Sequence, residues 1–247
     1  MQYIDILAGR DKDQRKEEFG QLTLRLGELW TIVGDTGSGK SRLIRDIEQL
    51  ADGDSVTGRK VHPDGLPLPR RQRQALSSGL IAHLSQNMRF SLDTTVEDFL
   101  RLHNLSRNKT VPTAEILSLA NEITPEPVRA SAHLNTLSGG QSRALMIADI
   151  ARICDSPIVL IDEIENAGID KVKALHLLLH HDKLLLVVTH DVQTALMAQR
   201  RIVMKNGAVA KVLKRSPGES ALYRKLSQEY EQCRLWQNSL RKGSVLA

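Results

Sequence analysis

Three short apolar runs, each followed by polar residues, predict the order of the secondary structure. Leu29–Val33 is an apolar strand that leads into a glycine-rich turn, and Ser41–Leu50 then has the 3.6-residue periodicity of a helix. Ile158–Ile161 and Leu184–Val188 are continuously apolar, as strands of a parallel sheet covered on both faces are. These patterns predict an α/β fold with a mainly parallel sheet.

Polar residues stand where these predicted strands stop. Lys40 lies beyond the first strand, and His190 follows the third. Asp162 and Glu163 close the second strand. Because ligands of open α/β sheets bind just beyond the carboxyl ends of the strands, we expect these side chains to share one site.

The middle of the chain and its C-terminal part change to helical patterns. Helix-like segments separated by prolines indicate a helical insertion at about residues 88–150. From Pro217 the spacing is helical again, and one apolar face is predicted from Leu222, Leu226, Tyr230 and Cys233. We therefore predict a main domain over residues 1–215 and a basic helical tail over residues 216–247.

The positive charge of the chain is concentrated in this tail. The formal net charge is +5, and residues 211–247 carry eight Lys or Arg against three Glu, so the remainder is neutral in sum. We favour a solvated basic helix, with attraction to a polyanion such as nucleic acid as the alternative. The segment 53–73 is interpreted as turns and an exposed basic loop, and the same two alternatives apply to its Arg70, Arg71 and Arg73.

The composition excludes several classes of protein. Hydrophobic residues make up 41% of the 247 positions and charged residues 26%, which argues against a disordered or fibrous chain. No apolar run approaches the roughly 20 residues of a membrane-spanning helix, and the N-terminus lacks the pattern of a signal peptide. We therefore expect a cytoplasmic protein whose two cysteines, Cys154 and Cys233, are reduced and partly buried.

The clearest chemical motif is GDTGSGKS, which fits the phosphate-binding pattern G-x-x-x-x-G-K-[ST]. Its glycines allow successive backbone N–H groups to point at an anion, and the helix that follows adds its positive end. The lysine would reach the β and γ phosphates of a nucleotide, and the last hydroxyl would ligate Mg²⁺. The expected phosphate-binding residues are Gly34, Asp35, Thr36, Gly37, Ser38, Gly39, Lys40 and Ser41.

A second motif, IVLIDE at residues 158–163, supplies carboxylates at a strand end. Asp162 is expected to hold the Mg²⁺ shell, which leaves Glu163 free to polarise the attacking water. An apolar strand followed by two acids is common by itself, and it gains meaning here because the phosphate-binding loop is present. Together the two motifs predict a P-loop NTPase core of the RecA-like type.

The class is decided by LSGGQ at residues 137–141, which lies between these two motifs. With Gln86 at the end of LIAHLSQ and His190 in VVTHD, it makes the chain resemble the ATP-binding cassette (ABC) ATPases over roughly residues 1–213. Five motifs in the family's order make coincidence negligible. The resemblance implies an N-terminal antiparallel β subdomain and an inserted α-helical subdomain that carries LSGGQ.

The resemblance also implies how the site is assembled. In the family, LSGGQ caps the γ-phosphate of the opposite subunit, so this motif would act across a head-to-tail homodimer that holds two ATP molecules. His190 would contact the γ-phosphate and help to orient Glu163, and Gln86 would sense Mg²⁺ beside Ser41 and Asp162. The expected reaction is Mg²⁺-dependent hydrolysis of ATP. The signature residues expected at the nucleotide are Ser138, Gly139, Gly140 and Gln141.

Two features depart from the family pattern. The family stacks adenine on an aromatic residue before the P-loop, but Ala8–Gln14 contains none, Tyr3 stands too early and Phe19 too late. Either Arg10 or an aliphatic residue covers the base, or base selectivity is weak. The D-loop, DEIENAGID, lacks the usual proline and ends at Asp170, which indicates a divergent branch of the family.

Two functions fit this reading. The favoured one is an ATPase subunit of a membrane transporter with separately encoded transmembrane subunits, cytoplasmic or peripheral at the inner face of the membrane. Residues around Phe90 would then accept a cytoplasmic helix of the membrane partner. The alternative is a soluble ABC ATPase that remodels or reactivates another enzyme or acts on a nucleic-acid complex. A nucleotide-gated dimer without turnover is disfavoured by Glu163.

A zinc site is a minor alternative. His176 and His180 have the i, i+4 spacing of metal ligands on a helix, and His181 and Asp182 follow them directly. No third ligand is indicated at a fixed structural offset, so we expect these residues to be an ordinary helix end.

Overall fold

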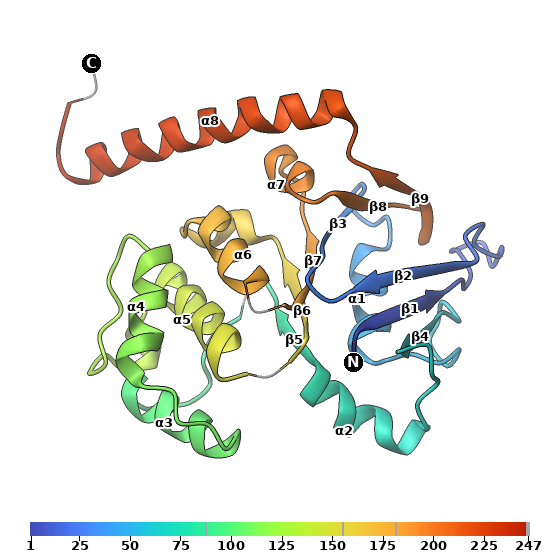
Figure 1. Cartoon of the computed structure of the whole chain (residues 1–247), viewed down its shortest axis with the longest axis horizontal. Coiled ribbons are helices and arrows are strands. Elements are labelled where there is room, and N and C mark those ends of the chain that lie inside the picture. Colours follow the sequence, from blue (N-terminus) through green and yellow to red (C-terminus); the bar gives the residue numbers. More distant parts are fainter. Residues whose placement is uncertain (87, 155, 181, 246–247) are drawn as a thin grey trace.

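Two β-sheets organise the chain, whose computed structural model describes residues 1–86, 88–154, 156–180 and 182–245 (Figure 1). The smaller sheet is antiparallel and contains β1 (Tyr3–Leu7), β2 (Gln21–Arg25) and β4 (Lys60–Pro63), in the order β2-β1-β4. The strands of the larger sheet are β3 (Leu29–Val33), β5 (Ile81–Leu84), β6 (Ile158–Asp162), β7 (Leu184–Val188), β8 (Arg200–Lys205) and β9 (Ala208–Lys214).

The larger sheet has the order β5-β6-β7-β3-β8-β9. All its neighbouring strands are parallel except β9, which pairs antiparallel with β8. The predicted mainly parallel α/β sheet and the N-terminal antiparallel β element are both confirmed. The strand order brings the carboxyl ends of β3, β6 and β7 to one edge, where the sequence places its polar motif residues.

Eight helices are described around these sheets, and they lie on both sides of the large one (Figure 1). Two 3₁₀ turns, Leu134–Thr136 and Ile164–Ala167, separate some of them. The helices are α1 (Lys40–Glu48), α2 (Arg70–Leu80), α3 (Val96–Ser106), α4 (Thr113–Ile123), α5 (Gly139–Arg152), α6 (Lys171–Leu179), α7 (Val192–Met197) and α8 (Pro217–Arg241).

The central strands are buried on both faces, and alternate residues belong to two different cores. In β6, Ile158 and Leu160 lie in the core shared with α1 and the small sheet. Val159 and Ile161 lie in the core shared with α5 and α6. Two-sided burial explains why these strands are continuously apolar in the sequence. In β6 and β7, polar side chains are consequently confined to the residues at and just beyond the strand ends, where they form the site.

Helices α3, α4 and α5 form a separate layer, coloured green to yellow-green in Figure 1. Leu100 of α3, Ile116 of α4 and Leu145 of α5 are all fully buried in one cluster. The layer lies in the chain where a helical insertion was predicted. It carries the LSGGQ residues at the N-terminus of α5.

The prediction of turns and an exposed basic loop over residues 53–73 is only partly right, because Arg70 and Arg71 are exposed but other parts of the segment are ordered and buried. The segment contains β4, and Arg70 begins α2. Arg59 is fully buried among carboxylates, and Arg73 is buried and paired with Asp54. The prolines and glycines of the segment suggested a loop, because a sequence does not show which cations find buried partners.

The tail forms the long helix α8, which lies across the top of the molecule in Figure 1 and passes α7. Its predicted apolar face is only partly right. Leu226 and Tyr230 are half-buried, but Leu222 is exposed and Cys233 is exposed instead of partly buried. The half-buried side of α8 faces away from Leu222, because polar contacts on that side hold the helix against the rest of the protein. Among the described residues, no helix is both long and apolar enough to span a membrane.

Candidate active site

The phosphate-binding loop joins β3 to α1 and packs against the turn between β8 and β9. Gly34, Gly37 and Gly39 have φ angles of 148°, 77° and 106°, a region that L side chains rarely adopt. A Cβ on Gly39 would approach the Cα of Gly207 to 2.7 Å. Glycine is therefore needed at position 39 for its conformation and for the close approach of the two segments.

Lys40 begins α1 and is only 8% exposed. Its ammonium donates to the carbonyl oxygens of Gly34 at 2.7 Å and Asp35 at 3.0 Å. The side chain therefore lies along the loop, and the positive charge is held beside the N–H groups that begin the helix. Ser41, the next residue, is exposed. Asp35, Thr36 and Gly37 are also exposed, so the loop is open to a ligand.

Glu163 is held at the edge formed by β5, β6 and β7. Its φ of 51° lies in the left-handed region, which is uncommon outside glycine. Its backbone N–H donates to Val188 at the end of β7, at 3.0 Å. Its side-chain Oε2 accepts a hydrogen bond of 2.6 Å from Nε2 of Gln86, which follows β5. The predicted pair Gln86 and Glu163 is thus brought together by two neighbouring strands.

His190 reaches the same edge through the segment that follows β7. Thr189 Oγ1 and the His190 backbone N–H both donate to Glu165 Oε1, at 2.9 and 3.2 Å. The His190 side chain is exposed, so it is accessible to a ligand. Glu165 therefore holds one side of the segment that contains His190. The sequence analysis did not predict a role for this residue.

Asp191 fixes the other side of the His190 segment. It accepts hydrogen bonds from the backbone and hydroxyl of Thr194, and it pairs with Lys171 at the start of α6. Burial acts to raise the pKa of the Asp191 carboxyl, but the hydrogen bonds from Lys171 and Thr194 outweigh it and lower the pKa. The carboxylate therefore stays charged at neutral pH and holds the segment in place.

The LSGGQ residues lie on the helical layer and not in the P-loop. Ser138 caps α5 by accepting from the Gln141 backbone N–H, and Gln141 Oε1 accepts from the Ser138 N–H in return. The Ser138 hydroxyl also donates to Glu126 at 2.8 Å, and Gln141 Nε2 donates to Pro127 at 3.0 Å. All their side-chain hydrogen bonds within the described residues stay in this layer. Among the described residues, the side-chain hydrogen bonds of the signature thus do not reach the P-loop.

Arg143 links the signature helix to the carboxylate motif, and sequence reasoning missed it. Its guanidinium donates to the backbone oxygens of Asp162 at 2.7 Å and Gln86 at 3.4 Å. Burial lowers the pKa of Arg143, although the negative charges of Asp162, Glu165 and Glu163 act in the opposite direction. A cation is thus placed among the carboxylates, two residues beyond LSGGQ. The signal in the sequence was a lone Arg after the motif.

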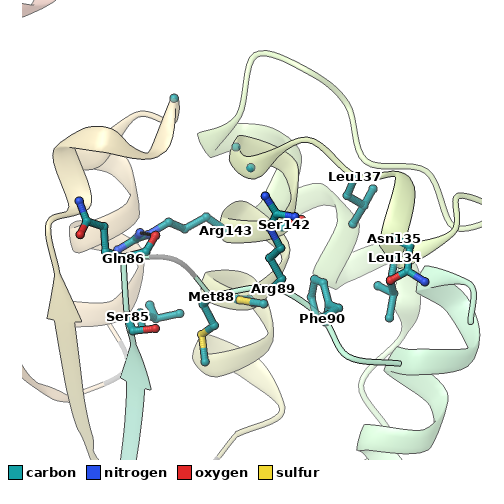
Figure 2. A pocket seen from close by; sticks show the side chains of 15 residues that line it. Ser85, Gln86, Met88, Arg89, Phe90, Leu134, Asn135, Leu137, Ser142 and Arg143 are labelled. Atoms are coloured by element: carbon teal, nitrogen blue, oxygen red, sulfur yellow. Dashed lines mark hydrogen bonds between the residues drawn. The ribbon is translucent and has the colours of Figure 1, made fainter. Parts of the chain in front are cut away.

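A cavity of about 980 Å³ opens beside Gln86. Figure 2 shows the Arg143 side chain extending across it toward Gln86, with Met88 and Phe90 on the segment between β5 and α3. Gly139 and Gly140 of the signature also line this cavity. The space thus lies where the sheet edge meets the helical layer.

The zinc alternative gains no support. His176 lies on α6 and His180 ends it, whereas His181 lies outside the described residues. Within the described part of the chain, no group of three or more His, Cys, Asp or Glu is placed to hold a metal ion.

Comparison with known proteins identifies the family. The sequence pattern described as ABC transporter matches residues 20–166, which is more than half of the chain. An ABC transporter ATP-binding protein of Methanocaldococcus jannaschii is 48% identical over 227 residues, which cover 91% of this chain and 87% of that protein.

Two solved structures share the fold. One is cbiO1 of Clostridium perfringens, part of an ABC transporter complex, with a TM-score of 0.65 and 19% identity over 98% of this chain and all of that one. The other is a dimeric ATP-binding cassette in a post-hydrolysis state with ADP and phosphate, with a TM-score of 0.62 and 23% identity over 85% of this chain and 98% of that one. The chain belongs to the ABC transporter family and is a P-loop ATPase.

Proposed function

We propose that the chain is the ATP-hydrolysing subunit of a membrane transporter, and that it works as a head-to-tail dimer on separately encoded transmembrane subunits. The observation that carries the proposal is the cavity beside Gln86, because it touches both the hydrolytic edge and the signature helix. A membrane partner bound in this cavity would contact both the hydrolytic edge and the signature helix, and its movement would be coupled to theirs. The protein would then be cytoplasmic and peripheral at the inner face of the membrane.

The proposed chemistry uses the residues gathered at the sheet edge. The P-loop N–H groups and Lys40 bind the β and γ phosphates, as the open loop and the buried ammonium favour. Glu163 accepts the proton of the attacking water, and Gln86 holds its carboxylate in place at 2.6 Å. His190 contacts the γ-phosphate from the segment that Glu165 orders.

The donor set at this edge fits Mg²⁺. A hydroxyl from Ser41, a carboxylate from Asp162 and the amide oxygen of Gln86 are all hard oxygen ligands, which Mg²⁺ prefers. Gln86 uses its amide nitrogen on Glu163, so its oxygen remains for the metal. The ion would neutralise charge on the phosphates during hydrolysis. Ser41, Asp162 and Gln86 are therefore proposed as the Mg²⁺ ligands.

The bonding of the signature residues supports the proposed dimer. Ser138, Gly139, Gly140 and Gln141 form an N-terminal anion cradle on α5, but their bonds stay in their own layer. A second copy, turned head to tail, would bring its P-loop to this cradle. The similar cassette seen with ADP and phosphate is dimeric, which supports this arrangement.

The membrane partner is tested by co-purification. A tagged Glu163→Gln protein is expressed in its own cell, extracted in mild detergent with ATP and Mg²⁺, and its partners are identified by mass spectrometry. We expect a stoichiometric protein with several membrane spans. Recovery of only soluble enzymes or nucleic acid would overturn the transport proposal.

A variant of the cavity gives the matched control. Met88 lines the cavity and is 44% exposed, so Met88→Glu places a charge there without disturbing the core. We expect it to lose the membrane partner while the isolated protein still hydrolyses ATP. Leu66→Glu, at a position that is 67% exposed and outside the cavity, should retain the partner. Equal loss in both variants would contradict docking at the cavity.

A further inference from the structure

A second lysine reaches the phosphate-binding loop from a distant part of the sequence. Lys12 lies in the loop between β1 and β2, and its ammonium donates to the carbonyl oxygen of Gly37 at 2.7 Å. Lys40 makes the same kind of bond to Gly34 and Asp35. Two ammonium groups therefore rest on carbonyls of one loop, and each keeps further N–H donors for a ligand.

The position of Lys12 is built into the fold. Its backbone N–H donates to Asn206 at 3.0 Å, and its side-chain stem crosses Gly207, where a Cβ would come within 2.9 Å of Lys12 Cγ. Gly207 in turn lies against Gly39 and donates to the carbonyl of Ser38 at 2.8 Å. Three segments are thus stacked in order: the Lys12 loop, the β8–β9 turn and the P-loop.

A buried ion-pair network anchors the base of this loop. The fully buried Arg59 binds both carboxylate oxygens of Glu17, at 2.9 and 2.6 Å, and the carbonyl oxygen of Gly207 at 2.6 Å. Glu17 also accepts from the backbone N–H groups of Gly9 and Val209. The two ends of the loop that presents Lys12 are therefore fixed to the turn beneath it, so the lysine is preorganised over the P-loop.

The cavity of about 300 Å³ that Lys12 enters has an unusual lining for a nucleotide site. Its residues are Lys12, Gly37, Gly39, Lys40, Ser41, Arg42 and Arg45, with no aromatic ring and no carboxylate among them. Tyr3 lies on β1, and Phe19 packs on the core of the small sheet. Neither lines this cavity. The cavity lining thus contains no aromatic ring that could stack on a base, whereas it contains several positively charged side chains.

We infer that Lys12 binds the phosphate chain of the nucleotide and that the site selects a nucleoside triphosphate by charge, with little discrimination between bases. The inference rests on the proposed nucleotide position at the P-loop. Discrimination between bases needs hydrogen bonds to the base edge, and cations and backbone glycines in a solvent-open rim do not provide a fixed pattern of them. Charge-assisted bonds to phosphate are available to every triphosphate alike.

The test measures binding of three nucleotides by calorimetry, in a Glu163→Gln background that preserves the nucleotide. MgATP, MgGTP and MgUTP are expected to bind with dissociation constants within about threefold of each other, because they share the phosphates. Lys12→Met keeps the apolar stem over Gly207 and removes the charge. The Lys12→Met variant should bind each of the three nucleotides about tenfold more weakly at low salt. This loss of affinity should be smaller in 0.5 M salt, because salt screens the charges. Lys12→Arg should restore binding.

Lys16→Met is the matched control, because Lys16 is an exposed lysine at the end of the same loop. It should leave all three affinities unchanged. Three results would overturn the inference: preference for MgATP by more than about tenfold, equal effects of the two lysine variants, or a Lys12→Met defect confined to purines. If the Glu163→Gln parent bound none of the nucleotides, the proposed function itself would fail, whereas selective ATP binding would leave it standing.

Discussion

At the residue scale, the proposed hydrolysis depends on a carboxylate whose position is fixed before any ligand arrives. Glu163 is held by its left-handed backbone, by the carbonyl of Val188 and by the amide of Gln86. A left-handed non-glycine residue costs free energy and persists where its surroundings hold it. Prior fixation lowers the reorganisation needed when the proton is transferred, which is how a static site accelerates phosphoryl transfer.

Glu163→Gln removes the proton acceptor and preserves the shape of the side chain. We expect kcat for phosphate release to fall by at least roughly a hundredfold, the lower range for loss of a general base. Affinity for MgATP should change little, since Lys40 and the loop remain. Phosphate release and calorimetric binding measure the two quantities. Turnover close to that of the parent would show that another group accepts the proton.

Arg143 is proposed as a positioning residue that couples the signature helix to the hydrolytic edge. Arg143→Met keeps the apolar stem and removes the bonds to Gln86 and Asp162. We expect kcat to fall about tenfold or more with KM nearly unchanged, because small displacements of catalytic groups are costly. Steady-state ATPase assays separate the two constants.

The control for Arg143 is Arg152→Met, near the other end of the same helix, where the guanidinium pairs with Glu115. That variant should retain its kcat. Arg143→Lys should restore part of the activity, because one of the two carbonyl contacts can be remade by an ammonium. A fall in thermal stability without any change in kcat would show that Arg143 is structural.

At the scale of the elements, α8 has no buried residue, and ion pairs and the cation–π contacts of Tyr223 and Tyr230 hold it to the rest of the protein. Glu219 near its start pairs with Arg201 of β8 and caps the helix with Ser216. Arg234, four turns later, pairs with Asp170, which is only 7% exposed and caps the N-terminus of α6. Two ion pairs thus fasten the helix, one of them to the D-loop.

The first fastening makes the docking of α8 sensitive to acid. The hydrogen bond from Arg201, and then that from the Ser216 backbone, lower the pKa of Glu219 from 4.5 to about 2. Its stabilisation is therefore complete above about pH 4.5 and is lost as the pH falls toward 2. The stability advantage of the parent over Glu219→Gln, about 1 kcal/mol at pH 6 for a partly exposed pair, should narrow over that range. Urea unfolding monitored by tryptophan fluorescence measures it, and a constant difference would contradict the linkage.

The second fastening should control the far half of α8. Arg234→Ala removes the pair with Asp170 and is expected to speed amide hydrogen exchange in residues 226–241, because the contact of Tyr230 with Lys171 then remains as the main anchor of this half. Arg224→Ala, at an exposed position of the same helix, is the control and should leave exchange unchanged. Equal protection in both variants would mean that the ion pair contributes nothing to docking.

These elements also show what the sequence could predict. The strands β3, β6 and β7 were predictable because burial on both faces leaves their interiors almost entirely apolar, and Thr31 of β3, whose hydroxyl donates to the Ala195 carbonyl oxygen, is the exception. Helix α2 was missed because only Arg73 is buried on it, so it has no apolar stripe. The packed side of α8 was misjudged because Arg234 and Glu219 dock it, and periodicity of apolar residues cannot detect ion pairs.

At the scale of the whole molecule, the sequence was sufficient to predict residues whose role depends on the local backbone. The glycines and the lysine of the P-loop are examples. Lys12, Arg143 and Glu165 escaped detection because their roles depend on contacts between segments far apart in the chain. The signature of one chain is likewise bonded only within its own layer among the described residues. In the proposed dimer, each nucleotide site would therefore combine the P-loop of one chain with the signature of the other.

The most direct test of this account is the mass of the Glu163→Gln protein in solution with and without MgATP, measured by sedimentation. The account predicts the 27.5 kDa monomer without nucleotide and twice that mass with saturating MgATP. Ser138→Arg in the same background should bind MgATP and stay monomeric, because the cradle that completes the partner site is blocked. A protein that remains monomeric with MgATP bound, or dimerises equally with Ser138→Arg, would contradict the account.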